Sequence, residues 1–334
     1  MKRKMGSVKD LEIIKKPDKD KHGIGRFHFS DRYSVFDYGE MPDMIENKGM
    51  ALCMLSAYFF EILEKEGIKT HYIGLVKDGK LYRFDEIDEP TNVMEIKLVN
   101  VVRDYDEIKK LRGNFLIPLE VIYRNTLPEG SSVFRRLERG EIKPEDLGLK
   151  KMPKPGQVLD KPIVDFSTKL EDVDRYLKRD EAMEIAGLSE EEMERLIETV
   201  KKINDIITRE TAKAGISNED GKIEFAFDEN RELMVVDAVG TPDECRFRFE
   251  GMEISKEILR KHYRKTEWYR RIQIFKGEEN WRKLVGKPPR LPQELKEAVS
   301  HLYMSCCNEI TGRKIFDSPP LKEVVKRIRE VSNG

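Results

Sequence analysis

Residues 189–237 read SEEEMERLIETVKKINDIITRETAKAGISNEDGKIEFAFDENRELMVVD. The first half repeats apolar side chains at helical spacing, and Ser189 with Glu192 matches the capping box that starts a helix. We therefore predict a long helix over residues 190–214. Two short apolar runs follow within residues 222–236, separated by the turn sequence Asp-Glu-Asn, and they predict a β-hairpin directly after the helix.

The order of elements outside this stretch indicates the fold class. Short strands and one helix, over residues 47–66, are predicted before residue 123, and mostly helices after residue 251. Residues 138–163 are rich in charge, glycine and proline, which predicts a loop-rich excursion. Strands grouped in this way, without regular βαβ alternation, favour an α+β fold with two lobes.

Composition excludes several classes of protein. The chain has 334 residues, with 62 Lys plus Arg against 63 Asp plus Glu, so its formal net charge is −1. This balance argues against a general nucleic-acid binder. The four cysteines form no C-x-x-C, so a zinc ribbon or redox motif is not expected. No apolar run approaches the length of a membrane helix, and we expect a cytoplasmic protein with no membrane partner.

Polar side chains gather in two segments near the start of the chain. Gly6 to Lys9 is a small-residue turn with a lysine, which can hold phosphate; a flexible terminus is the alternative. The second segment carries two carboxylates, a hydroxyl and a helix-start lysine, namely Asp31, Ser34, Asp37 and Lys48. A lysine together with the N-terminus of a helix favours the binding of an anion. The alternative is a solvated loop and an exposed lysine, whose loss would matter by only about a few tenths of a kcal/mol. If Lys48 instead steadies the transferred charge, Lys48→Met should lower kcat at least about tenfold and leave thermal stability near wild type.

Two later segments offer further chemistry. Arg124 ends a predicted strand and Ser131 follows a Gly-Ser turn, so both can bind phosphate or carboxylate, although an edge-strand arginine would look the same. Glu224 and Asp237 lie on the two strands of the predicted hairpin, where a carboxylate pair suits Mg²⁺. A solvated acidic face is the alternative. Close to this hairpin, a turn carries two residues that can grip a polar substrate, Asp243 and Arg246.

Taken in order, these segments resemble the SAICAR synthetase family. Residues 118–131 contain Pro-Leu-Glu-Val-Ile-Tyr-Arg-Asn and Gly-Ser, similar to the family's P-x-E-x-x-x-R-N…G-S. Residues 222–246 contain Lys-Ile-Glu-Phe, Asp and Thr-Pro-Asp-x-x-Arg, similar to K-L-E-F-G…D-E…T/S-P-D-x-x-R. Residues 31–49 resemble its D-x-x-S-x-x-D…K-G loop, and residues 6–9 its G-K-x-K turn. The resemblance covers roughly residues 1–250.

The resemblance implies a fold and a reaction. The fold is a two-lobed α+β body related in shape to ATP-grasp enzymes, with ATP between the lobes. Residues 1–117 would form a mainly β nucleotide-binding lobe, and residues 118–334 an α+β substrate and metal lobe with a helical tail. The reaction joins L-aspartate to the carboxylate of carboxyaminoimidazole ribonucleotide (CAIR), through an acyl phosphate, and gives SAICAR, ADP and phosphate in purine biosynthesis.

The resemblance also implies residue roles, with ATP and Mg²⁺ as cofactors. The nucleotide would be bound by Gly6, Lys9 and Glu120, and the metal by Glu224 and Asp237. The substrates would be bound by Asp31, Ser34, Asp37, Arg124, Ser131 and Arg246. The catalytic set would be Lys48, Lys222 and Asp243.

Some positions depart from the family pattern. Ser7 replaces the first lysine of G-K-x-K, and Ala238 replaces the acidic residue that often follows the metal-site aspartate. Two alternatives therefore stay open beside the SAICAR-forming ligase: an ATP-dependent amide ligase acting on another carboxylate, and a nucleotide-binding relative without turnover. The sequence does not fix the oligomeric state, and a homo-oligomer stays open.

Overall fold

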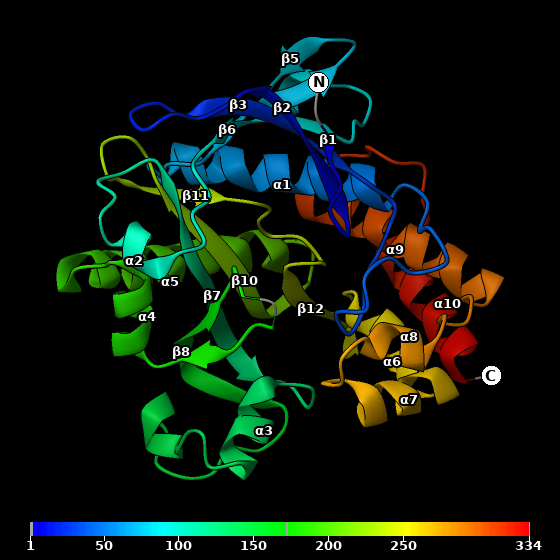
Figure 1. Ribbon diagram of the computed structural model, residues 1–334. Helices are drawn as coiled ribbons and strands as arrows, with labels where there is room; N and C mark the ends of the chain where they lie inside the picture. The colour runs from blue at the N-terminus through cyan, green and yellow to red at the C-terminus, as the bar shows by residue number, and fades with distance from the viewer. Residues whose placement is uncertain (1–2, 172, 334) are drawn as a thin grey trace.

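The computed structural model describes residues 3–171 and 173–333 and contains two antiparallel sheets flanked by helices (Figure 1). The first sheet has the strand order β1-β2-β3-β6-β4-β5. Its strands are β1 (Arg3–Lys4), β2 (Lys9–Lys15), β3 (Gly23–Phe29), β4 (Tyr72–Lys77), β5 (Lys80–Tyr82) and β6 (Val93–Leu98). Every predicted strand before residue 100 therefore belongs to one sheet.

Helix α1 (Lys48–Lys65) packs beneath this sheet, against β3, β4 and β6 (Figure 1). Helix α9 (Gln293–Thr311) packs against another side of α1. Because α1 is covered by several elements, apolar side chains around most of its surface are buried. The prediction of a helix over residues 47–66 is confirmed.

The second sheet has the order β13-β12-β10-β7-β8-β9, and β11 pairs with β10. Its strands are β7 (Phe115–Leu127), β8 (Gln157–Thr168), β9 (Tyr176–Leu177), β10 (Ser217–Phe227), β11 (Leu233–Val236), β12 (Cys245–Phe249) and β13 (Met252–Glu253). The predicted hairpin is confirmed as β10 and β11, with Glu224 opposite Val236. This register brings Asp237, the next residue, beside Glu224.

The prediction that residues 138–163 form a loop-rich excursion is wrong for its last part. Residues 157–163 belong to β8, which pairs with β7. A shift in the register between Arg124 and Thr126 leaves the stretch around Pro162 without regular pairing, and the first half of β8 is largely exposed. Proline is tolerated at such an irregularity, and an exposed strand shows little apolar alternation, so the strand lacked its usual signature.

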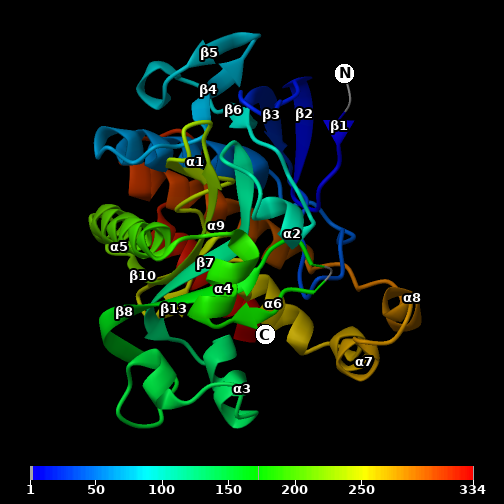
Figure 2. The same ribbon diagram turned by 60° about the vertical axis from the view of Figure 1, so that its left-hand side comes forward.

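Helices surround the second sheet and form the end of the chain (Figure 2). They are α2 (Tyr105–Ile108), α3 (Ser132–Glu138), α4 (Arg179–Ala186), α5 (Glu190–Ala212), α6 (Glu257–Arg264), α7 (Glu267–Phe275), α8 (Trp281–Val285) and α10 (Leu321–Asn333), with short 3₁₀ turns at Phe84–Glu86 and Pro144–Leu147. The predicted long helix is confirmed as α5, and Ser189 and Glu192 form the expected capping box. Within the described part of the chain, no helix has the length and apolarity to span a membrane.

The two sheets and their helices confirm the α+β two-lobed fold class. The first sheet ends at Leu98 and the second begins at Phe115. The exact division between residues 117 and 118, and the kinship with ATP-grasp enzymes, stay predictions.

Candidate active site

Two pockets adjoin each other: the first lies between the two sheets, and the second lies against the second sheet and the helices beside it. The first, of about 520 Å³, is bordered by the turn before β2 and by β10 and the end of β11. The second, of about 720 Å³, is bordered by β7, the start of α3 and the start of α6. Asp37, Lys222 and Asp243 line both pockets, so the two open onto each other at these side chains. All predicted site residues line one pocket or the other, except Asp31 and Lys48.

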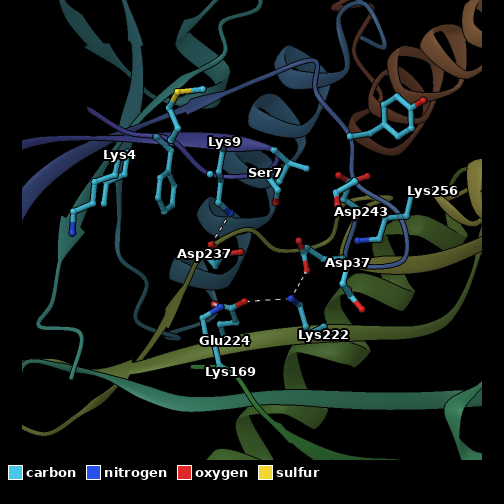
Figure 3. Close-up of a pocket in the computed structure, with 18 of the residues that line it drawn as sticks. Lys4, Ser7, Lys9, Asp37, Lys169, Lys222, Glu224, Asp237, Asp243 and Lys256 are labelled. Atoms are coloured by element: carbon cyan, nitrogen blue, oxygen red, sulfur yellow. Dashed lines mark ion pairs between the residues drawn. The ribbon is translucent and has the colours of Figure 1, made fainter. Parts of the chain in front are cut away.

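Three lysines and two carboxylates meet in the first pocket (Figure 3). Lys9 Nζ lies 2.6 Å from Asp237 Oδ1, and Lys169 Nζ lies 2.5 Å from Glu224 Oε2. Lys222 Nζ lies 3.3 Å from the other oxygen of Glu224. Lys222 and Glu224 are two residues apart on β10, which puts their side chains on one face of the sheet. The cluster thus combines the first turn, the hairpin and the end of β8.

The electrostatics of this cluster keep most of its members charged. Burial raises the pKa of Glu224, and the neighbouring charge of Asp237 raises it further. Burial also acts to raise the pKa of Asp237, but Lys9, Lys169 and Lys222 outweigh it, so that pKa is lowered. Burial acts to lower the pKa of Lys222, but the carboxylates around it outweigh that effect and raise its pKa. Polyphosphate entering this pocket would therefore meet fixed ammonium groups.

The residues of the first pocket fit a nucleotide-bound Mg²⁺. No group of three or more potential metal ligands gathers anywhere in the described residues. Glu224 and Asp237 are nevertheless two hard oxygen donors facing one pocket. Mg²⁺ is commonly held by one or two carboxylates together with substrate phosphates and water, so a pair is sufficient.

The second pocket is rich in arginine and in charges of both signs, with eight cationic and nine acidic side chains in its lining. Arg124 is 3% exposed, and one of its terminal nitrogens lies 3.2 Å from an oxygen of Asp165. Asp220 Oδ2 lies 2.9 Å from Arg246 Nη1 and 3.6 Å from Arg124 Nη1, so this carboxylate stands between the two arginines. The remaining cations that line the pocket are Arg135, Lys222, Lys256, Arg260, Arg264 and Lys276. The arginines of this lining can bind the phosphate or carboxylate groups of a ligand, and its carboxylates can accept from hydroxyl or amino groups of the same ligand.

Other predicted residues of this region have local partners. Ser131 lines the second pocket and also caps α3, where its Oγ accepts from Val133 N. Glu120, expected at the nucleotide together with Gly6 and Lys9, lines only the second pocket, with Oε1 2.8 Å from Lys222 Nζ. Ser34 lines the first pocket, and Asp37 lines both.

Asp243 accepts hydrogen bonds from two buried side chains that line neither pocket. Lys48 Nζ donates to Asp243 Oδ2 at 2.8 Å, and Tyr303 Oη donates to Asp243 Oδ1 at 2.6 Å. Burial acts to raise the pKa of Asp243, but Lys48 and Lys256 bring it down to about 2. Lys48 is 0% exposed, so the alternative of an exposed helix-start lysine is wrong. Asp31 also lies behind the pockets, where its Oδ1 accepts from Gly49 N at the start of α1.

The structure adds residues that the sequence analysis missed. Lys169 follows β8, whose first part was predicted as loop and whose last residues carried no prediction, so nothing marked it. Lys256 and Arg260 line both pockets but come from the start of α6, beyond the recognised motifs. Asp174 lines the second pocket, and burial together with Glu120 raises its pKa to about 6. Single charged residues in a loop or on a helix carry no signature of their own, so only the fold reveals these four.

A lysine-and-carboxylate pocket that opens onto an arginine-rich pocket is typical of enzymes that bind a nucleotide and an anionic substrate together. The family model for SAICAR synthetase matches residues 6–274. The chain belongs to the SAICAR synthetase family.

Individual relatives are named as phosphoribosylaminoimidazole-succinocarboxamide synthases, which is the full name of SAICAR synthetases. The chain is 64% identical over 331 residues to a protein of Archaeoglobus fulgidus described as a putative phosphoribosylaminoimidazole-succinocarboxamide synthase, covering 98% of this chain and 99% of that one. It is 35% identical over 299 residues to a phosphoribosylaminoimidazole-succinocarboxamide synthase of Thermoplasma acidophilum, covering 86% and 93%. Both alignments extend well beyond the recognised motifs.

Solved structures share the fold. The SAICAR synthase of Saccharomyces cerevisiae in complex with SAICAR aligns with a TM-score of 0.64 at 24% identity, covering 93% of this chain and 94% of that one. A SAICAR synthetase in complex with ADP aligns with a TM-score of 0.62 at 23% identity, covering 94% and 99%. At these identities the likeness establishes the fold of the chain.

Proposed function

We propose that this chain catalyses the ATP-dependent joining of L-aspartate to the carboxylate of CAIR, which gives SAICAR, ADP and phosphate. One observation carries the proposal: a lysine-and-carboxylate pocket opens directly onto an arginine-rich pocket, in a chain whose 64% identical relative bears this enzyme's name. We assign ATP to the first pocket and the ribonucleotide to the second. Transfer would take place where they meet, at Asp37, Lys222 and Asp243.

A free carboxylate is a poor acyl donor, so the reaction requires its activation. In the first step, a carboxylate oxygen of CAIR forms a bond to the γ-phosphorus of ATP, and ADP leaves with the electrons of the broken P–O bond. In the second step, the aspartate amine attacks the acyl carbon and loses a proton, and phosphate leaves. The first step moves negative charge from the carboxylate to the departing ADP oxygen, and the second moves it onto the acyl oxygen and then onto the departing phosphate, so fixed cations are the chief requirement.

The residues of the chain divide this work. Lys9, Lys169 and Lys222 would hold phosphate oxygens, and their ion pairs with Asp237 and Glu224 position them before ATP arrives. Arg124 and Arg246 would hold the ribonucleotide, with Asp220 setting the angle between them. Mg²⁺, when bound by Glu224 and Asp237, would neutralise part of the polyphosphate charge. Lys48 lines neither pocket and would act through Asp243, as a positioning residue.

The departures from the family pattern leave the cluster well supplied with charge. Ser7 lines the first pocket without a charge, but Lys4, Lys9 and Lys169 line the same pocket. Ala238 removes one acidic residue, and two carboxylates remain beside the lysines. These contacts weigh against a relative without turnover. The cytoplasmic location and a homo-oligomer stay predictions.

The proposed function predicts that ADP release requires CAIR and L-aspartate together. The measurement is a coupled ADP-release assay in which each substrate is omitted in turn, with the product identified by mass. The decarboxylated ribonucleotide, which lacks the group to be activated, is the matched control and should support no ADP release above background. Equal ADP release with and without CAIR, or a product formed on another carboxylate, would contradict the proposal.

The second pocket predicts a substrate-specific defect in Arg124→Lys. A lysine keeps the charge but loses the planar fork that Arg124 places among Asp165, Asp220 and the pocket. We expect the KM for CAIR to rise by about tenfold, equivalent to about 1.4 kcal/mol, with the KM for ATP changed less than about twofold. Arg248→Lys is the control, because Arg248 lies on the same sheet and pairs with Glu219 outside both pockets. A defect confined to ATP would contradict the assignment.

A further inference from the structure

Helix α9 reaches the site from outside the region that the family model matches. That match ends at residue 274, whereas α9 spans Gln293–Thr311. Two of its side chains, three residues apart and so on one helix face, turn toward the start of α1. Ser300 Oγ donates to Glu46 O at 2.6 Å, just before Lys48 in the chain. Tyr303 reaches past the start of α1 and donates a hydrogen bond from its hydroxyl to Asp243.

Tyr303 and Lys48 each donate a hydrogen bond to a different oxygen of the Asp243 carboxylate. Tyr303 takes Oδ1 at 2.6 Å and Lys48 takes Oδ2 at 2.8 Å, so each oxygen has its own donor. Tyr303 is 1% exposed, and Lys48 Nζ lies 5.4 Å from the centre of its ring, so the three groups form one buried unit. Burial raises the pKa of Tyr303 well above its ordinary value, and its hydroxyl therefore remains a neutral donor.

We propose that Tyr303 is a positioning residue for the ligase reaction: with Lys48 it fixes the carboxylate of Asp243 where the two pockets meet. The inference rests on the proposed function, and it gives the C-terminal helices a part in the site. Without the hydroxyl, Oδ1 of Asp243 loses its donor while Oδ2 stays with Lys48. The carboxylate can then rotate toward the pocket cations Lys256 and Arg260, which line the same two pockets.

The experiment is a double-mutant cycle between Tyr303 and Asp243. Tyr303→Phe keeps the ring and removes only the hydroxyl, and we expect kcat to fall by about tenfold, because the carboxylate of Asp243 loses one of its two donors. The KM for ATP should change less than about twofold. In an Asp243→Asn background, the same substitution should lower the remaining kcat by less than about twofold, because the carboxylate it positions is gone.

Tyr72→Phe is the matched control for loss of a buried tyrosine hydroxyl. Tyr72 is 3% exposed, its Oη donates to Glu61 Oε1 at 3.0 Å, and it lines neither pocket. Both single variants should lose thermal stability to a similar extent, but only Tyr303→Phe should lose kcat. Thermal unfolding and steady-state kinetics on the full chain compare the two directly.

Different outcomes separate this inference from the proposed function. A wild-type chain without CAIR-dependent ADP release would overturn the proposed function and the inference with it. An active wild type in which Tyr303→Phe matches Tyr72→Phe in kcat would overturn the inference alone. The inference alone would also be overturned if Tyr303→Phe lowered kcat by the same factor in the wild type and in the Asp243→Asn background. If Tyr303→Phe failed to fold while Tyr72→Phe folded normally, the hydroxyl of Tyr303 would serve the fold, and the inference would also be overturned.

Discussion

Asp237→Asn is expected to reduce turnover at least about 100-fold, equivalent to about 2.7 kcal/mol. Asp237 faces three lysines, and its lowered pKa shows that its negative charge is strongly stabilised in the folded chain. Asparagine keeps the shape but removes the charge and one hard oxygen donor, so the Mg²⁺ concentration for half-maximal activity should rise steeply. The measurement is a Mg²⁺ titration of the initial rate at saturating substrates.

Nucleotide binding supplies a second readout that does not depend on turnover. The lysines remain in Asp237→Asn, and one opposing charge is lost, so ADP without metal should bind at least as tightly as it does to wild type. The difference in ADP affinity with and without Mg²⁺ should shrink, as measured by calorimetry.

Asp228→Asn is the control for the hairpin. Asp228 sits at the turn between β10 and β11, pairs with Lys69, and lines neither pocket of the site. It should lose some stability and keep its Mg²⁺ dependence. If Asp237→Asn kept the wild-type rate and Mg²⁺ dependence, the metal assignment would be wrong.

The sequence predicted those parts of the fold whose signals are local. The capping box and apolar repeat of α5 lie within one continuous stretch, as does the turn between β10 and β11. The hairpin register alone is enough to bring Asp237 beside Glu224, because it depends on the turn and the two runs that flank it. The fold class followed from the order of such elements.

The missed parts depend on contacts between distant segments. β8 is a strand because β7 offers it a partner, and its own exposed half carries no alternation that would predict it. Lys169 came with that strand and was missed with it. The burial of Lys48 likewise arises from Asp243 and Tyr303, which are far along the chain, and a lysine before an apolar helix reads as exposed until α9 covers it.

Lys48→Met is expected to lower both stability and kcat. The sequence predicted that Lys48→Met would leave stability near wild type, and the complete burial of Lys48 reverses that prediction. Removing one partner of a buried pair leaves the other charge without compensation, which typically costs about 3–5 kcal/mol in the free energy of unfolding. Asp243 lines both pockets, where solvent can hydrate its carboxylate, so we expect about 3 kcal/mol, the lower end.

The kinetic effect of Lys48→Met can be separated from this loss of stability. Lys48→Met with Asp243→Asn removes both charges, so the double variant should regain most of the unfolding free energy lost by the single one. Its kcat should stay at least about tenfold below wild type, because the carboxylate that faces both pockets is absent. Denaturant unfolding and steady-state kinetics give the two quantities for each variant.

Lys69→Met is the control for loss of a lysine paired with carboxylates. Lys69 is half exposed and pairs with Asp228 and Glu232 away from the site, so its loss should cost about 1 kcal/mol or less and leave kcat unchanged. Lys48 would be removed from the proposed machinery if Lys48→Met kept a normal kcat and normal KM values for all three substrates. In that case the contact between Lys48 and Asp243 would serve only to hold α1 against the second sheet. Loss of such a role would lower the free energy of unfolding and leave the kinetics unchanged.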